Sequence, residues 1–211
     1  MTRQPGFTLV EIAIVLVIIG LLLGGILKGQ EMITQAKIKN TAADFSGLSA
    51  AYYGYQDRYR AIPGDDPGAS RWTGATNGNG NGVVAGKYNS STATDESLLW
   101  WDDLRRAGFV SGSGTNQPFN AFTGYLGVQT GDAAGSTALG GFSGLITCSA
   151  NIPDKVAIAL DTQMDDGLID KGTLRGQKQA APNPDIVGTI AAGDIPYAET
   201  GTNTYTLCRA L

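Results

Sequence analysis

The sequence predicts an α+β protein, in which one long N-terminal α-helix packs on a small antiparallel sheet in a C-terminal globular head. Three observations predict this fold. Residues 12–27 carry no charge, apolar residues then recur at helical spacing as far as position 59, and the segment 204–210 alternates like a strand. The helix is therefore expected to be transmembrane in its first half and amphipathic in its second half.

The apolar segment 7–27 contains a single ionisable side chain, Glu11. As a helix it would span about 31 Å, which is enough to cross the core of a bilayer. A cleaved secretory signal fits badly, because the flanking GGILKGQEM offers no small-x-small cleavage site. A plain membrane anchor stays open, with Glu11 reaching the interface. A carboxylate inside an apolar segment is nevertheless costly in lipid, and therefore indicates a function.

The helix is expected to continue to about Arg60, within a segment 7–61 that Pro63-Gly64 ends. Its second half carries an apolar stripe that needs a partner surface. The stripe consists of Ile38, Ala42, Phe45, Leu48, Tyr52, Tyr55 and Tyr59.

The head, residues 62–211, is expected to supply that surface. Capping signals predict short helices over about 95–107 and 154–165. The run FTGYLGVQ, residues 122–129, suits an edge strand, and the terminal TYTLCRA reads as another strand. Docking strands onto the apolar stripe gives an α+β head.

The N-terminal hexapeptide GFTLVE, residues 6–11, follows a short leader containing Arg3 and precedes the apolar run. This arrangement resembles the processing motif of type IV prepilins and type II secretion pseudopilins. The resemblance implies a leader peptide, residues 1–6, that a prepilin peptidase removes between Gly6 and Phe7. It also implies methylation of Phe7, and pairing of Glu11 with the N-terminal amine of a neighbouring subunit during filament assembly.

The resemblance further implies a structural subunit of a type IV pilus-like filament. Its partners would be other pilin subunits and an inner-membrane assembly platform. Before assembly the chain would cross the inner membrane once with its head in the periplasm, and afterwards it would belong to an extracellular or periplasmic filament. The alternatives are a type II secretion pseudopilin and a membrane-tethered extracellular binding module that does not polymerise.

Major pilins often carry a proline about twenty residues after the cleavage site, but this chain has none between Phe7 and Ile62. It has glycines at positions 20, 24 and 25, and each of them lowers the stability of the helix locally where the proline is missing. This departure favours a minor pilin or an accessory pilin-like protein.

Composition argues against several other functions. The chain has no histidine, which excludes imidazole-based catalytic triads and zinc sites, so we do not expect an enzyme. Few charges and a net charge of −4 argue against nucleic acid as a partner. Arg105-Arg106 beside Trp100-Trp101 could suggest stacking on bases, but a core face and a solvated face are the more typical reading.

The two cysteines, Cys148 and Cys208, are 60 positions apart, which does not fit a C-x-x-C metal or redox motif. In an exported head the simplest expectation is one disulfide. Two buried free thiols are the alternative.

A structural calcium ion is the one cofactor that the sequence leaves open. Asn77, Asn79 and Asn81 resemble the opening of a calcium loop, but Tyr88 stands where such loops end in glutamate. Some pseudopilins carry a structural calcium, so two groups of acids could assist. These are Asp65 and Asp66, and Asp165, Asp166 and Asp170. The alternative is a Gly/Asn turn with ordinary solvated acids.

Overall fold

The computed structural model describes residues 8–133 and 136–211, and its fold is α+β, as the sequence predicts. The chain divides into two compact units, one ending at Lys37 and the other beginning at Ile38. The long helix α1 runs from Leu9 to Tyr59, so it begins in the first unit and continues in the second. These bounds confirm the predicted helix to within two residues at the ends.

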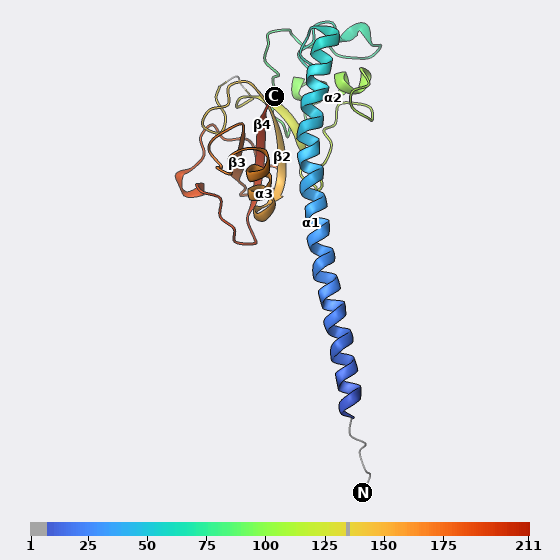
Figure 1. Cartoon of the computed structure of the whole chain (residues 1–211). Helices are drawn as coiled ribbons and strands as arrows, with labels where there is room; N and C mark the ends of the chain where they lie inside the picture. Colours follow the sequence, from blue (N-terminus) through green and yellow to red (C-terminus); the bar gives the residue numbers. More distant parts are fainter. Residues whose placement is uncertain (1–7, 134–135) are drawn as a thin grey trace. The chain divides into compact units, whose positions relative to one another are not determined.

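The second unit contains one four-stranded antiparallel sheet with the order β1-β2-β4-β3 (Figure 1). Its strands are β1 (Leu126–Thr130), β2 (Leu145–Pro153), β3 (Leu174–Lys178) and β4 (Thr204–Ala210). The C-terminal strand β4 is confirmed where the sequence predicts it. It lies inside the sheet, between β2 and β3.

Two short helices accompany the sheet, as predicted. They are α2 (Glu96–Arg106) and α3 (Asp154–Met164), and single 3₁₀ turns occur at Ala69–Arg71 and Ala192–Asp194. Helix α3 follows β2 directly, and Pro153 occupies the position before its first residue.

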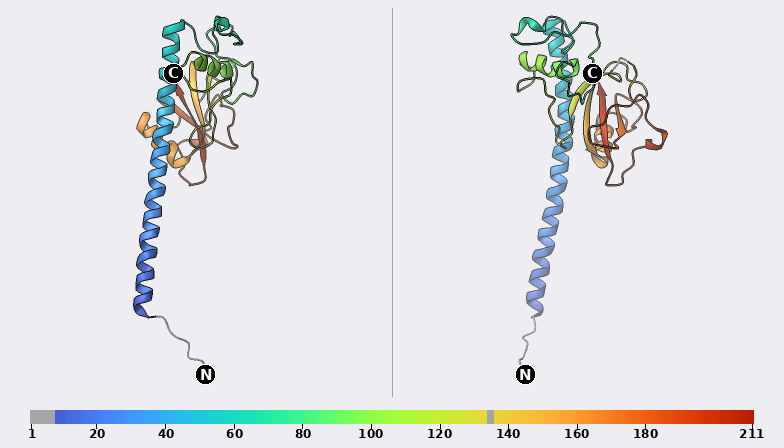
Figure 2. Two further views of the ribbon diagram at one scale, coloured as in Figure 1. Left: turned by 90° about the vertical axis from the view of Figure 1, so that its right-hand side faces the viewer. Right: turned by 180° about the vertical axis from the view of Figure 1, so that it is seen from behind.

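The predicted apolar stripe of α1 packs in two of the core clusters of the second unit, and the sheet lies alongside this part of the helix (Figure 2). Ile38 and Phe45 pack in one cluster with side chains of α3 and β4. Leu48, Tyr52 and Tyr55 pack in a second cluster with α2 and β1. The stripe is therefore covered by two different parts of the head, which explains why it extends over several turns of helix.

Strands β2 and β3 were not predicted individually. β3 reads LRGQK and has one large apolar residue, so its pattern is not that of a buried strand. An added Cβ at Gly176 in β3 would lie 3.0 Å from Leu207 on β4 and 3.1 Å from the Tyr197 hydroxyl, so neighbouring side chains pack closely against this glycine. The packing of neighbours, and not local propensity, therefore selects this strand.

The predicted edge strand starts later than expected. β1 begins at Leu126, because the side chain of Asn120 holds the preceding residues in a turn. Its Oδ1 accepts hydrogen bonds from the backbone N–H groups of Phe122 and Gly124 at 2.8 and 3.0 Å. Asparagine is well suited to this arrangement, since its side chain can replace a backbone acceptor in a turn.

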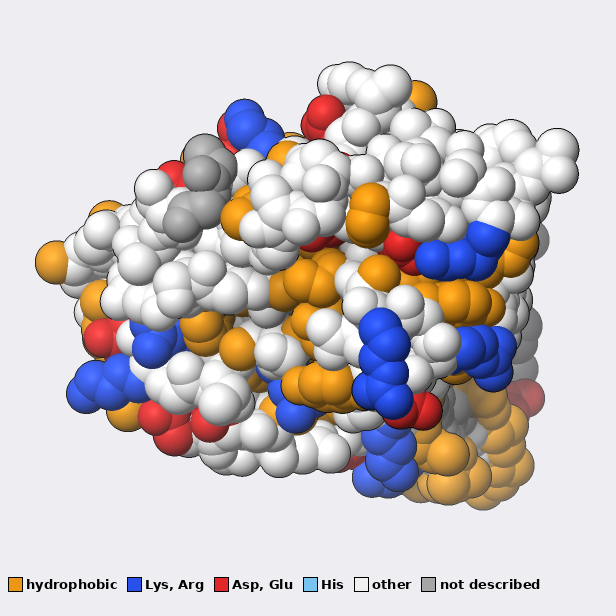
Figure 3. Space-filling model, turned by 90° about the horizontal axis from the view of Figure 1, so that it is seen from above, with side chains coloured by type: hydrophobic (Ala, Val, Ile, Leu, Met, Phe, Trp, Pro, Cys, Tyr) orange, Lys and Arg blue, Asp and Glu red, His pale blue; other side chains and the backbone are white. Residues whose placement is uncertain are grey.

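Charged side chains are scattered over the face of the molecule seen in Figure 3. Uncharged side chains and backbone cover most of that face, with Lys, Arg, Asp and Glu interspersed. The uncharged surface agrees with the composition, in which charged residues make up 16% of the chain.

Candidate functional site

The first turn of α1 is closed by a reciprocal pair of side chains, Thr8 and Glu11. The backbone N–H and the hydroxyl of Thr8 both donate to Glu11 Oε2 at 2.8 Å, and the Glu11 N–H donates to Thr8 Oγ1 at 3.3 Å. This is a capping box, which satisfies N–H groups that have no acceptor within the helix. Glu11 also lies at the positive end of the helix dipole, where a carboxylate is favourable.

Thr8 was not among the predicted functional residues, although its spacing to Glu11 is the threonine-x-x-glutamate signature of a capping box. Both Thr8 bonds end on Oε2 of Glu11. Within the described residues, Oε1 accepts no hydrogen bond and remains open to a second donor. Gly6 and Phe7, the predicted cleavage and methylation residues, lie outside the described residues.

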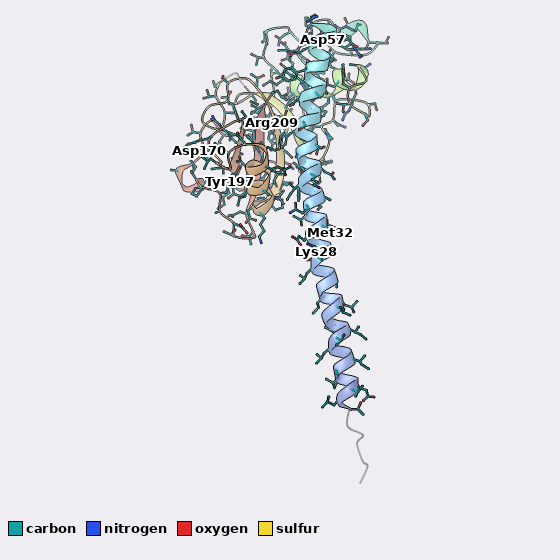
Figure 4. All side chains as sticks on the ribbon, viewed as in Figure 1. Lys28, Met32, Asp57, Asp170, Tyr197 and Arg209 are labelled. Carbon is teal, nitrogen blue, oxygen red and sulfur yellow. A yellow bond between two sulfur atoms is a disulfide. The ribbon has the colours of Figure 1, made fainter. Side chains whose placement is uncertain are left out.

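The apolar segment that follows Glu11 has its side chains exposed on all sides (Figure 4). Every large apolar side chain from Leu9 to Leu27 is between 46% and 86% exposed. α1 is long and apolar enough to cross a membrane, and none of its apolar window is buried. So large an apolar surface is typical of a segment that another phase or another molecule covers.

The glycines of this segment leave space along the helix. An added Cβ at Gly20, Gly24 or Gly25 would meet no atom within 4 Å. Packing within the described chain therefore does not require these glycines. At the end of the segment Lys28 and Glu31 form an exposed ion pair of 2.7 Å, which contributes little stability in water but marks the return of polar residues.

Cys148 and Cys208 form the predicted disulfide. They lie directly opposite each other on the adjacent strands β2 and β4, and both are fully buried. The bond ties the last strand of the chain to the centre of the sheet. The alternative of two free thiols is wrong.

The structure brings Asp65 together with the asparagine loop, the first group of calcium candidates, but the oxygens of these side chains already accept hydrogen bonds from backbone N–H groups. Asp65 is 3% exposed, and its carboxylate accepts from the N–H groups of Gly80 (2.6 Å), Asn81 (3.1 Å) and Gly82 (2.7 Å). The amide oxygens of Asn77, Asn79 and Asn81 each accept one backbone N–H, from Ser70, Asn81 and Val83 respectively. The loop thus folds around the Asp65 carboxylate.

The neighbouring Asp66 has other partners. Its carboxylate accepts from the Tyr55 hydroxyl at 2.6 Å and from Arg71 at 2.6 Å, in a network that is largely buried. Burial raises the pKa of Asp66, but the hydrogen bonds from Arg71 and Tyr55 outweigh it and hold that pKa below its usual range. Asp66 therefore joins the end of α1 to the loop that follows it.

The second group is a closer match to a cation site. Oxygens of Asp161, Asp165 and Asp166 lie within 4.8 Å of one another, whereas Asp170 is not part of this set. Asp161 is fully buried and accepts from the Tyr197 hydroxyl at 2.6 Å, and burial raises its pKa to about 6. Carboxylates at this spacing could hold a divalent cation, and a structural calcium at either group stays a prediction.

Arg105, Arg106, Trp100 and Trp101 do not form a stacking platform. Both indole rings are buried in the core, at 0% and 1% exposure. Arg105 donates to the carbonyls of Gly114 and Asn116, and Arg106 donates to Asp102 at 2.6 Å. These four side chains hold α2 in place.

One comparison with known proteins identifies the N-terminus. Residues 1–27 match the family described as the prokaryotic N-terminal methylation motif, which is the prepilin-type signal of type IV pilins and pseudopilins. The match covers Gly6, Phe7, Glu11 and the apolar segment, but not the head. No curated protein matches the chain. The motif indicates a structural, membrane-anchored protein rather than an enzyme.

Proposed function

We propose that this chain is a structural subunit of a type IV pilus-like filament, processed by a prepilin peptidase and assembled through α1. The observation that carries the proposal is the match of residues 1–27 to the methylation motif, combined with a helix whose apolar segment is exposed on every side. Processing would remove residues 1–6 and leave a methylated Phe7 at the new N-terminus.

The apolar segment of α1 would serve twice. In the membrane, lipid covers the side chains from Leu9 to Leu27. In the filament, the same side chains would pack against the helices of other subunits, so that removal from lipid exposes little apolar surface to water. The open space beside Gly20, Gly24 and Gly25 would let a second helix approach closely.

Glu11 would link processing to assembly. Cleavage after Gly6 creates an amine at Phe7, and an unpaired charge in the interior of a filament costs several kcal/mol. Because the Thr8 bonds end on Oε2, Glu11 could keep its capping role while Oε1 accepts the amine of a neighbouring subunit. The carboxylate would thus have two partners at once.

The head would lie in the periplasm before assembly and on the surface of an extracellular or periplasmic filament afterwards. The disulfide supports this location, because such bonds persist in oxidising compartments. Incorporation would require the inner-membrane assembly platform and other pilin subunits as partners.

The proposal is tested by intact-mass spectrometry of the native protein and of filaments sheared from cells. We expect a mature species that begins at Phe7, carries a methyl group and occurs in the sheared fraction. Gly6→Val should block cleavage, since a branched side chain crowds the scissile peptide, whereas the exposed Asp57→Asn should be processed normally. A mature species that retains residues 1–6 would refute the processing. Processed protein found only in membranes would favour the tethered module.

A further inference from the structure

The head contains a surface cavity of about 370 Å³. It lies between residues 90–98 and 115–125, on the loops beside α2 and β1. Its volume is within the range of small-molecule binding sites, roughly 300–1,000 Å³.

The cavity is lined by neutral polar side chains, by two aromatic rings and by the apolar side chains of Ala93 and Leu98. Among the described residues, no Asp, Glu, Lys or Arg lines it. The polar lining includes Ser90, Ser91, Thr115, Asn116 and Gln117. A lining without charge provides no partner for a phosphate or a carboxylate, which proteins bind with charge-assisted hydrogen bonds.

The aromatic wall consists of Phe119 stacked on Tyr125. The ring centroids are 5.1 Å apart with an interplanar angle of 23°, and Phe119 is 65% exposed. The face of an aromatic ring is electron-rich, so it attracts the partly positive C–H groups on the face of a ligand ring. An exposed stacked pair at the edge of a cavity is therefore a platform for a ring that carries C–H groups on one face.

Several polar groups around this platform lack a partner. Within the described part of the chain, no hydrogen bond engages the Tyr125 hydroxyl, the Ser91 hydroxyl or the side-chain amide of Asn116. These groups offer both donors and acceptors, and they suit a ligand that is itself rich in hydroxyl groups.

The backbone beneath these groups is held firmly. The buried Asn120 donates to Ser149 Oγ at 2.7 Å and to the Ala150 carbonyl at 2.6 Å, which fixes the residue next to Phe119. On the other side, Arg105 donates to the Asn116 carbonyl at 2.8 Å. A cavity whose walls are already ordered loses less conformational entropy when it binds a ligand.

We propose that this cavity binds a neutral pyranose sugar. The C–H face of the sugar ring would stack on Phe119, and its hydroxyl groups would bond to Asn116, Tyr125 and Ser91. This inference goes beyond the filament role, since it gives the head a carbohydrate ligand whether or not the chain polymerises.

Saturation-transfer NMR on the full chain tests the proposal. The protein is held in micelles of a zwitterionic detergent without a sugar headgroup, and the probes are D-glucose, D-galactose, D-mannose and N-acetylglucosamine. N-acetylneuraminic acid is the charged comparison. We expect transfer to the ring C–H protons of at least one neutral sugar and little to the charged one. No transfer to any neutral sugar, or equal transfer to the charged sugar, would overturn the proposal.

Variants then locate the site. Phe119→Ala should raise the dissociation constant by about tenfold or more, because a stacked aromatic anchor dominates such contacts. Tyr125→Phe keeps the stack and removes one hydroxyl, so its effect should be smaller. The control is Tyr53→Ala, which removes another exposed aromatic ring, on α1 and outside the cavity. Equal losses in Phe119→Ala and the control, or no loss in Phe119→Ala with unchanged melting, would contradict a site at this cavity.

Discussion

Replacement of Asp103 by asparagine is expected to stabilise the head at and above neutral pH. Asp103 lies on α2, is 1% exposed, and accepts the Gly64 N–H at 2.7 Å. Burial raises the pKa of its carboxyl to about 7, and the negative charges of Asp66 and Asp102 act in the same direction. The charged form is therefore disfavoured in the folded protein.

The sign of the effect follows from proton binding. In the unfolded chain an aspartate has a pKa of about 3.9, so between that value and about 7 the folded state holds a proton that the unfolded state has lost. The neutral carboxyl contributes its full stability to the folded protein below the lower pKa. This contribution falls as the pH rises between the two pKa values, and it is lost once the pH has passed through the higher one. A pKa difference of about three sets an upper limit of roughly 4 kcal/mol.

Asparagine is neutral at every pH and can still accept the Gly64 N–H. The stability of Asp103→Asn should therefore not fall with pH in this way. At pH 8 the variant should melt several degrees above the wild type, since about 1 kcal/mol changes Tm by roughly 2–4 °C in a domain of this size. Asp103→Ala should not share the gain, because it leaves the buried Gly64 N–H without its acceptor.

Thermal unfolding followed by tryptophan fluorescence measures this effect, because Trp100 and Trp101 are buried on the same helix. Asp161, with a pKa raised to about 6 by burial, is present in both proteins, so the difference between them isolates Asp103. The matched control is Asp57→Asn, whose carboxylate is 84% exposed. Parallel stability curves for wild type and Asp103→Asn between about pH 5 and pH 8 would refute the reasoning.

Two further predictions follow from the disulfide and from the capping box. Cys208→Ser opens a loop of 60 residues and should lower stability by about 4 kcal/mol on a chain-entropy basis, seen as a lower Tm and faster proteolysis after about residue 200. An unchanged Tm would contradict a stabilising role for the bond. Thr8→Val should cost the first turn of α1 about 1 kcal/mol and speed its amide exchange, whereas Thr8→Ser should not. Equal exchange in both variants would contradict the cap.

Much of the fold could be predicted because its signals are local. The unbroken apolar run, the helical stripe and the proline-glycine stop define α1, and the alternating TYTLCRA defines β4. β3 gave no such signal, because Gly176 and Gln177 are buried by their neighbours and not by their own hydrophobicity. Long-range packing decides such strands.

Some residues of the candidate sites could likewise be found from local sequence signals, and others could not. Glu11 could be found from the sequence because a carboxylate stands out in an apolar segment. Thr8 could have been found from its spacing to Glu11, but threonine is unremarkable in composition and its role depends on side-chain geometry. The cavity beside Phe119 could not be found, since it brings together residues 90–98 and 115–125 through tertiary contacts.

The capping box makes the test of filament assembly sharper. Glu11→Leu removes both the charge and the cap, so a defect in that variant has two explanations. Glu11→Gln keeps an oxygen that can accept from Thr8 but cannot neutralise an amine. Thr8→Val does the reverse, because it weakens the cap and keeps the carboxylate.

The most direct measurement compares the amount of protein in sheared filaments with the amount in membranes for wild type, these three variants and Glu11→Asp. Membrane insertion should be unchanged or improved in Glu11→Gln and Glu11→Leu, because a charge in an apolar helix is costly in lipid. Filament incorporation should fall sharply in both, since each junction would bury an unpaired amine. Thr8→Val should incorporate nearly as wild type, and Glu11→Asp should be intermediate. Normal incorporation of Glu11→Gln and Glu11→Leu would contradict the pairing and leave a membrane-tethered head as the better account.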